Sequence, residues 1–173
     1  MRVLSYVSTA LLISFAASAA AQDMPKRKSG LWEITTTSGN MGAAQAQAGN
    51  AVVQMCIDEK TDNAVQQQAS GVAKQSCSKQ NMRRSGNEVV VDSVCKFGET
   101  TATTHSVFTG SFESAYKVDT RSTYDPPMMG MKEGSAVIEA RWLGPCKPDQ
   151  RPGDMILGNG VKINVNQRNG PAR

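Results

Sequence analysis

The fold of this 173-residue chain is decided by residues 28–38, Lys28-Ser29-Gly30-Leu31-Trp32-Glu33-Ile34-Thr35-Thr36-Thr37-Ser38. After the glycine the side chains alternate, with Trp32 and Ile34 on one face and Glu33 and Thr35 on the other. This period of two, carried by aromatic and β-branched residues, is typical of a strand with one buried face. We therefore predict a domain built from β-strands, beginning with this one.

The same alternation returns along the chain between turn residues. Ser85-Gly86-Asn87 is typical of a hairpin turn, and the segment Asp125-Pro126-Pro127-Met128-Met129-Gly130-Met131 should break the ladder, because proline cannot donate a backbone hydrogen bond. We expect strands over residues 30–37, 51–56, 77–84, 88–97, 100–110, 111–124 and 132–143, followed by a small hairpin of residues 155–157 and 161–165.

A helix is indicated only over residues 58–70. Thr61 or Asp62 can cap it, alanine and glutamine continue it, and Gly71 should end it. Its apolar face is thin, which favours a position on the surface. The predicted fold is therefore mainly β, a strongly curved antiparallel sheet or incomplete β-barrel with one short surface helix.

The first 21 residues have the features of a secretory signal peptide. Arg2 precedes an uncharged apolar run from Val3 to Ala17, and small residues follow up to Ala21. This run is shorter than the roughly 20 residues needed to cross a bilayer, so we expect no transmembrane segment in the mature chain. The prediction is an exported protein, periplasmic or secreted, with one β-domain over residues 22–166 and a disordered tail over residues 167–173.

The net charge argues against nucleic acid as a partner. Removing residues 1–21 takes away one of the 19 basic residues and leaves a small surplus over the 15 acidic ones. Such a surplus supports only weak non-specific binding to phosphates, and export separates the protein from nucleic acid.

All the cysteines lie in the mature chain, and an even number in an exported protein indicates two disulfides. Cys77 and Cys95 lie at equal distances from a turn centred on Gly86, so antiparallel pairing places them side by side. Cys56 and Cys146 should then meet at the other end of the sheet. A bridge from Cys56 to Cys77, closing the helical loop, stays open as the alternative.

Several motifs occur together in a characteristic order. They are the run from Lys28 to Ile34 after a signal peptide, Gln54-Met55-Cys56, Cys77, Arg84-Ser85-Gly86-Asn87, Cys95 and Gly144-Pro145-Cys146. In this order they resemble the domain of unknown function 3617 family, over most of the mature chain from Lys28 to about Asn164. The resemblance implies a small exported bacterial protein with no assigned activity, and it brings no catalytic residues.

His105 is the only histidine in the sequence, so a Ser-His-Asp or Cys-His mechanism would have to use it. Ser106, Ser111, Asp119 and Asp125 are near in sequence, but none has the context of a nucleophile, and the thiols are expected to be oxidised. We therefore predict no catalytic residues and no cofactor, with a hydrolase as a weaker alternative.

Met128, Met129 and Met131, together with His105, are the candidate metal ligands, because thioethers bind Cu(I). Methionines in such a loop more often pack over an apolar opening. We predict no metal site, and a copper-binding protein is kept as a minor alternative.

The chain is poor in aromatic residues, and those of interest here are Trp32, Trp142, Phe112, Tyr116 and Phe97. On a closing sheet they can line a cavity for a small apolar ligand, or they can fill the core. We predict a non-catalytic binding module for a small apolar ligand or an envelope protein partner. The alternative is a structural or interaction protein with a filled core.

Overall fold

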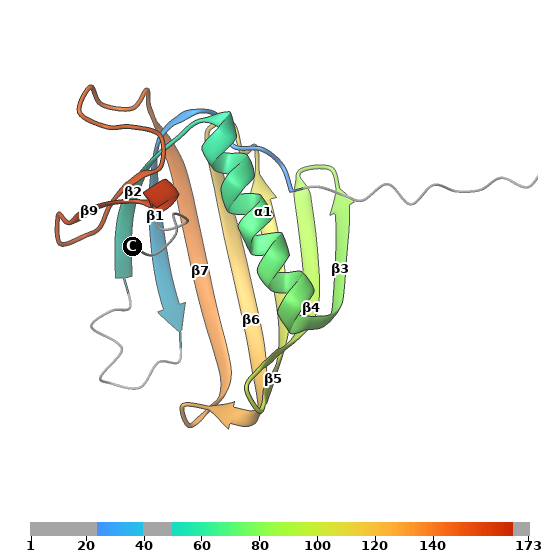
Figure 1. Cartoon of the computed structure of the whole chain (residues 1–173). Coiled ribbons are helices and arrows are strands. Elements are labelled where there is room, and N and C mark those ends of the chain that lie inside the picture. The colour runs from blue at the N-terminus through green and yellow to red at the C-terminus, as the bar shows by residue number, and fades with distance from the viewer. Residues whose placement is uncertain (1–23, 40–49, 168–173) are drawn as a thin grey trace, which may run out of the picture.

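The computed structural model describes residues 24–39 and 50–167. In this part of the chain the fold is one antiparallel sheet of nine strands, with one helix lying across one of its faces (Figure 1). The sheet is not closed, so the predicted mainly β fold with an open sheet and one helix is confirmed. The expected signal peptide, residues 1–21, and residues 168–173 of the predicted tail lie outside the described residues.

Most predicted strands are present with nearly the predicted limits. Across the sheet the order is β3-β4-β5-β6-β7-β1-β2-β8-β9. Along the chain the elements are β1 (Gly30–Gly39), β2 (Asn50–Ile57), α1 (Glu59–Ser76), β3 (Cys77–Ser85), β4 (Glu88–Phe97), β5 (Thr100–Gly110), β6 (Ala115–Met128), β7 (Met131–Gly144), β8 (Asp154–Ile156), β9 (Lys162–Asn164) and a 3₁₀ turn (Val165–Gln167).

The predicted break in the ladder at this segment is confirmed, although strand β6 itself continues past the prolines and its predicted end at residue 124 is wrong. β6 runs on to Met128, which pairs with Met131 at the start of β7. The β6–β7 ladder is interrupted between Thr123 and Met128, and the pairing of β6 with β5 ends one residue before the prolines. Pro126 and Pro127 therefore occupy positions at which no ladder hydrogen bond is required.

Helix α1 has a different cap and is longer than predicted. Its N-cap is Asp58, whose carboxylate accepts a 2.7 Å hydrogen bond from the Thr61 N–H, so the predicted caps Thr61 and Asp62 lie inside the helix. Gly71 does not end the helix, which continues to Ser76. The reason is tertiary, because α1 has to span the sheet from the end of β2 to the start of β3 (Figure 1). A glycine inside a helix costs only about 1 kcal/mol.

The hydrophobic core lies between β1, β2, β7 and the N-terminal half of α1. Trp32 is at its centre with 0% of its surface exposed, and the register places Met55 and Trp142 on either side of it. Val65 of α1 packs against this group. The sheet therefore buries the Trp32 face under the helix, while the other face is mostly polar and includes a row with the valines Val90, Val107 and Val137.

A buried ion pair ties the segment before β1 to the helix. Arg27 Nη2 lies 2.7 Å from Asp62 Oδ1, and the Asp62 side chain is only 2% exposed. The Arg27 N–H and the Gln66 amide donate to the other carboxylate oxygen, at 3.1 Å each. Each oxygen of this buried acid is therefore hydrogen-bonded, which offsets the cost of removing its charge from water.

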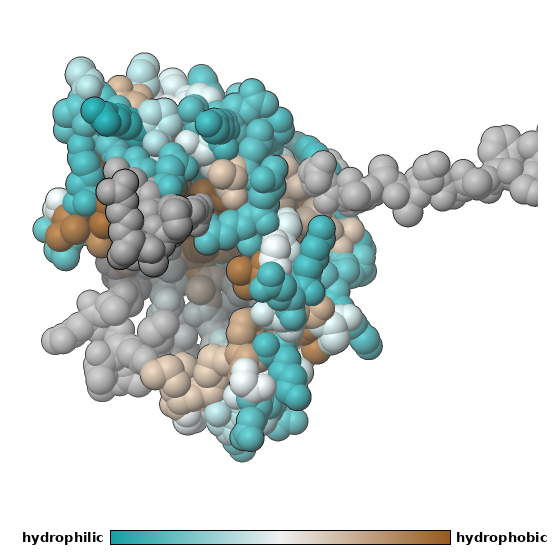
Figure 2. Space-filling view, viewed as in Figure 1, coloured by the Kyte–Doolittle hydropathy of each residue, from teal (hydrophilic) through white to brown (hydrophobic). Residues whose placement is uncertain are grey.

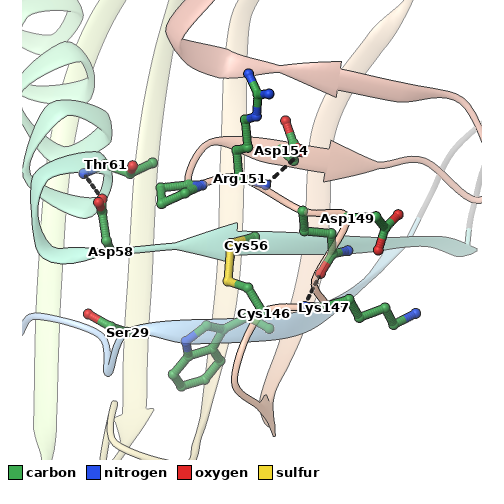
Figure 3. The surroundings of a disulfide bond; sticks show 12 residues. Ser29, Cys56, Asp58, Thr61, Cys146, Lys147, Asp149, Arg151 and Asp154 are labelled. Atoms are coloured by element: carbon green, nitrogen blue, oxygen red, sulfur yellow. Dashed lines mark hydrogen bonds between the residues drawn. A yellow bond between two sulfur atoms is a disulfide. The ribbon is translucent and has the colours of Figure 1, made fainter.

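The predicted disulfides are both present, and the alternative bridge from Cys56 to Cys77 is excluded. Cys77–Cys95 joins β3 and β4 at positions that also pair in the ladder. Cys56–Cys146 spans 90 residues of sequence and connects β2 with the segment after β7 (Figure 3). Beside it, the N–H of Gly153 donates to the carbonyl of Cys56 and β8 pairs with β2, so the C-terminal hairpin extends the sheet here.

Candidate functional site

A groove of about 960 Å³ crosses strands β3 to β7. The register sets one row of its lining side chains directly opposite one another, Asp92, His105, Arg121 and Ser135. By the alternation of each strand, this row lies on the face opposite Trp32. The next row on that face includes Val94, the only apolar side chain among the described residues of the lining. The groove is therefore a polar surface, distinct from the core.

His105 is held by an acidic partner within this groove. Its Nδ1 lies 2.6 Å from Asp92 Oδ1, and the other oxygen of Asp92 accepts a 2.7 Å hydrogen bond from Arg83. The hydrogen bond with His105, together with the charge of Arg83, lowers the pKa of Asp92 below its usual range. Asp92 therefore stays ionised and can orient the imidazole ring.

Sequence reasoning missed Asp92 and Arg83 as partners of His105. The signal was present, because the predicted hairpin of residues 88–97 and 100–110 places Asp92 directly opposite His105, as the register confirms. Of the residues near His105 in sequence, Asp119 lies in the next row of the same face, where its carboxylate pairs with the Lys117 ammonium at 3.2 Å. Ser106 is on the opposite face of β5, where its hydroxyl lies 3.0 Å from that of Thr120. Proximity in sequence is a poor guide in a strand, since consecutive side chains point to opposite faces.

Within residues 24–39 and 50–167, no hydroxyl forms a hydrogen bond with His105, so none is held there as a nucleophile. The pairs Thr104–Ser122 and Ser106–Thr120 join hydroxyls to each other on the Trp32 face. A His–Asp pair alone orients a base and does not provide a reacting group. The arrangement around His105 can therefore hold a polar group or an anion.

The candidate copper ligands are not brought together. Met128 and Met131 pair at the β6–β7 turn, and Met129 is 80% exposed there. His105 lies in the row of Ser135, which is about 13 Å along β7 from Met131 at the usual strand rise. Within the described residues no three His, Cys, Asp or Glu side chains lie close enough to hold a metal ion. Copper binding stays an untested alternative.

The aromatic residues singled out in the sequence gather at one end of the sheet, with the exception of Phe97. Tyr116 stacks on Phe112 with ring centroids 5.0 Å apart, and its ring lies 5.6 Å from that of Trp32. Trp142 pairs with Trp32 in the register. Phe97 is 47% exposed at the far end of β4, so placing it in the core or a cavity was wrong.

Polar contacts cover the outer side of this aromatic cluster, Trp32, Trp142, Phe112 and Tyr116. The indole of Trp142 donates to the carbonyl of Ser29 at 3.1 Å, and the ammonium of Lys28 lies 3.9 Å from its ring centroid. The cluster packs on itself and on the segment before β1. Its role in lining a ligand site stays a prediction.

A second hollow of about 530 Å³ lies on the polar face near Glu33 and Arg141. Arg141 donates to one oxygen of Glu33 from Nη2 and Nε, at 2.6 and 2.9 Å. Gln54 donates to the other oxygen at 3.3 Å. These hydrogen bonds, Arg141's first, lower the pKa of Glu33. The polar face therefore carries ordered charges across most of its width.

Comparisons with known proteins add family membership to this geometry. A family model described as "Protein of unknown function (DUF3617)" matches residues 27–146, a stretch that includes α1, β1 to β7 and both disulfides. No curated protein and no solved structure gives a significant match. Across residues 24–39 and 50–167, no helix combines the length and hydropathy needed to cross a membrane. The expected resemblance is confirmed, and the chain belongs to the DUF3617 family of proteins of unknown function.

Proposed function

We propose that the protein is an exported, non-catalytic binding protein, periplasmic or secreted, that holds a protein partner on its open sheet. Export is supported by the two disulfides, which persist in oxidising compartments. The signal-like sequence of residues 1–21 points the same way.

The observation that carries the proposal is the polarity of the groove that crosses strands β3 to β7. Sites for small apolar ligands are lined mainly by apolar and aromatic side chains, whereas Val94 is the only apolar side chain that the described part of the chain contributes to this groove. The helix-bearing face is also largely hydrophilic, with apolar residues in small separate areas (Figure 2). A polar, open surface favours a protein partner over a small apolar ligand.

Native mass spectrometry and cross-linking of protein purified from the cell envelope test this proposal. We expect a bare native mass after purification and a reproducible cross-linked protein partner before it. A co-purifying mass of lipid size would instead support an apolar ligand held by the aromatic cluster. A bare mass without any cross-linked partner would contradict binding and favour a structural protein with a filled core.

A further inference from the structure

Strand β3 forms one margin of the sheet, and its outer edge has no strand partner within the described residues (Figure 1). Most of its side chains are exposed. In an antiparallel edge strand, every second residue directs its backbone N–H and C=O away from the sheet. The edge therefore presents unpaired hydrogen-bonding groups along nine residues.

The charge along this edge has one sign. From Asn63 to Asn87 the sequence contains no acidic residue, and its basic residues are Lys74, Lys79, Arg83 and Arg84. Among the ion pairs of the described residues, only Arg83 of these four has an acidic partner, Asp92. Lys79 and Arg84 lie on opposite faces of β3, as their ladder partners on β4 require. The edge therefore offers uncompensated positive charge on both of its faces.

Charge complementarity decides which occupant fits this edge. A second copy of β3, paired antiparallel, would set basic side chains against basic side chains, which is unfavourable. An extended segment with acidic residues on both of its faces satisfies the backbone groups and the charges together. Resting on the proposed function, we propose that the outer edge of β3 binds an extended acidic segment of a partner protein by β-strand addition.

Binding of synthetic peptides to the purified, disulfide-bonded mature protein tests the proposal. The probe is a fluorescent peptide of threonine and glutamate, as long as β3, and the control replaces each glutamate by lysine. We expect the acidic peptide alone to bind, more weakly as salt rises. In hydrogen-exchange mass spectrometry its binding should slow exchange at the amides of β3.

Charge reversal at the edge tests the role of its basic residues, and a reversal elsewhere on the protein supplies the matched control. Lys79→Glu with Arg84→Glu should weaken binding of the acidic peptide by about tenfold or more and allow the lysine peptide to bind. Lys132→Glu with Lys147→Glu makes the same change in net charge away from β3 and should leave the affinity within about twofold. Circular dichroism checks that each variant is folded.

Three outcomes would overturn the inference. They are equal binding of both peptides, unchanged exchange in β3, and binding to vesicles of anionic lipid without binding to the peptide. A cross-linked partner whose capture survives the Lys79 and Arg84 reversals would refute the β3 site while leaving the proposed function intact. Absence of any partner would instead defeat the proposed function.

Discussion

Gly30 illustrates how a single residue position is determined by its surroundings. Its φ is +135°, a backbone conformation that favours glycine. A side chain at this position would also collide with the carbonyl of Gly144 and the indole nitrogen of Trp142. Close approach of β1 to the end of β7 therefore requires the glycine that opens the first strand.

Gly30→Ala should destabilise the protein by about 2 to 4 kcal/mol through crowding and backbone strain. Urea unfolding measures this change. Gly86→Ala is the control, because Gly86 also has a positive φ, +58°, but has open space around it. Its cost should be about 1 to 2 kcal/mol from the backbone alone. Equal losses in the two variants would contradict the role of the Trp142 contact.

The buried Arg27–Asp62 pair provides a second prediction at this scale. Asp62→Ala leaves the largely buried guanidinium of Arg27 without its partner, so the free energy of unfolding should fall by about 3 kcal/mol or more. Glu59→Ala removes an exposed pair with Lys26 and should cost less than about 1 kcal/mol. Chemical denaturation compares the two variants. A similar, small loss in both would show that burial of Asp62 adds nothing.

At the scale of elements, local pattern located most strands but misjudged their ends. The valine-rich run predicted β4 over residues 88–97, and the strand has those limits. Pro126 and Pro127 interrupt the ladder as predicted but do not end β6, and Gly71 does not end α1. The prolines lie where no ladder hydrogen bond is required. A glycine inside a helix has only a small cost, and α1 has to reach the far end of the sheet.

Gly71→Ala should stabilise the protein by about 0.5 to 1 kcal/mol, because alanine has the higher helix propensity. Open space surrounds the position of the new methyl group, so no collision opposes the gain. The melting temperature of the oxidised protein is the measurement. A decrease would indicate that flexibility at Gly71 is required in α1.

At the scale of the whole molecule, an open sheet is held together by one local and one long-range bridge. Cys77–Cys95 closes a loop between adjacent strands, whereas Cys56–Cys146 spans 90 residues. The long bridge connects β2 with the segment after β7, which ties the first hairpin to the last long strand. This connection helps to hold together the strands that surround the hydrophobic core.

Removing the long bridge should destabilise the protein more than removing the short one. In the chain-entropy model, Cys56→Ala with Cys146→Ala costs about 4 kcal/mol, and Cys77→Ala with Cys95→Ala about 3 kcal/mol. Cys56 is also fully buried, so its truncation adds a cavity term of the same sign. Urea unfolding of the two double variants tests this order, and the reverse order would be inconsistent with it.

Acid should weaken the fold, because several carboxyl groups have pKa values lowered by hydrogen bonds to their charged forms. As the pH falls, the unfolded state therefore binds protons before the folded state does. The stabilisation of the fold by these carboxylates is present above about pH 4 and is lost below it. We expect the free energy of unfolding to decrease from about pH 5 to about pH 3. The groups are Glu33, Asp58, Asp92 and Asp154.

Asp154→Asn tests the contribution of one of these groups. The pKa of Asp154 is lowered first by the backbone N–H of Arg151 and then by Asn164. The variant should show a flatter dependence of unfolding free energy on pH than the parent. Urea titrations at several pH values provide both curves, and an unchanged slope would remove Asp154 from the explanation.

The sequence by itself determined what depends on near neighbours. Period-two alternation marked the strands, and the equal spacing of Cys77 and Cys95 about Gly86 predicted their bridge, which the structure contains. The same reasoning locates Asp92 opposite His105. These features lie within single hairpins, where the turn sets the register.

Only the tertiary structure decided which distant segments meet. Glu33 and Arg141 are 108 residues apart, and Arg27 and Asp62 are 35 apart, yet each pair is in direct contact. Their meeting follows from β1 pairing with β7 and from α1 crossing the sheet to cover Trp32. Burial of the core and the long disulfide both favour this arrangement of the strands and the helix. Both depend on the folding of the whole chain, so no local sequence pattern contains them.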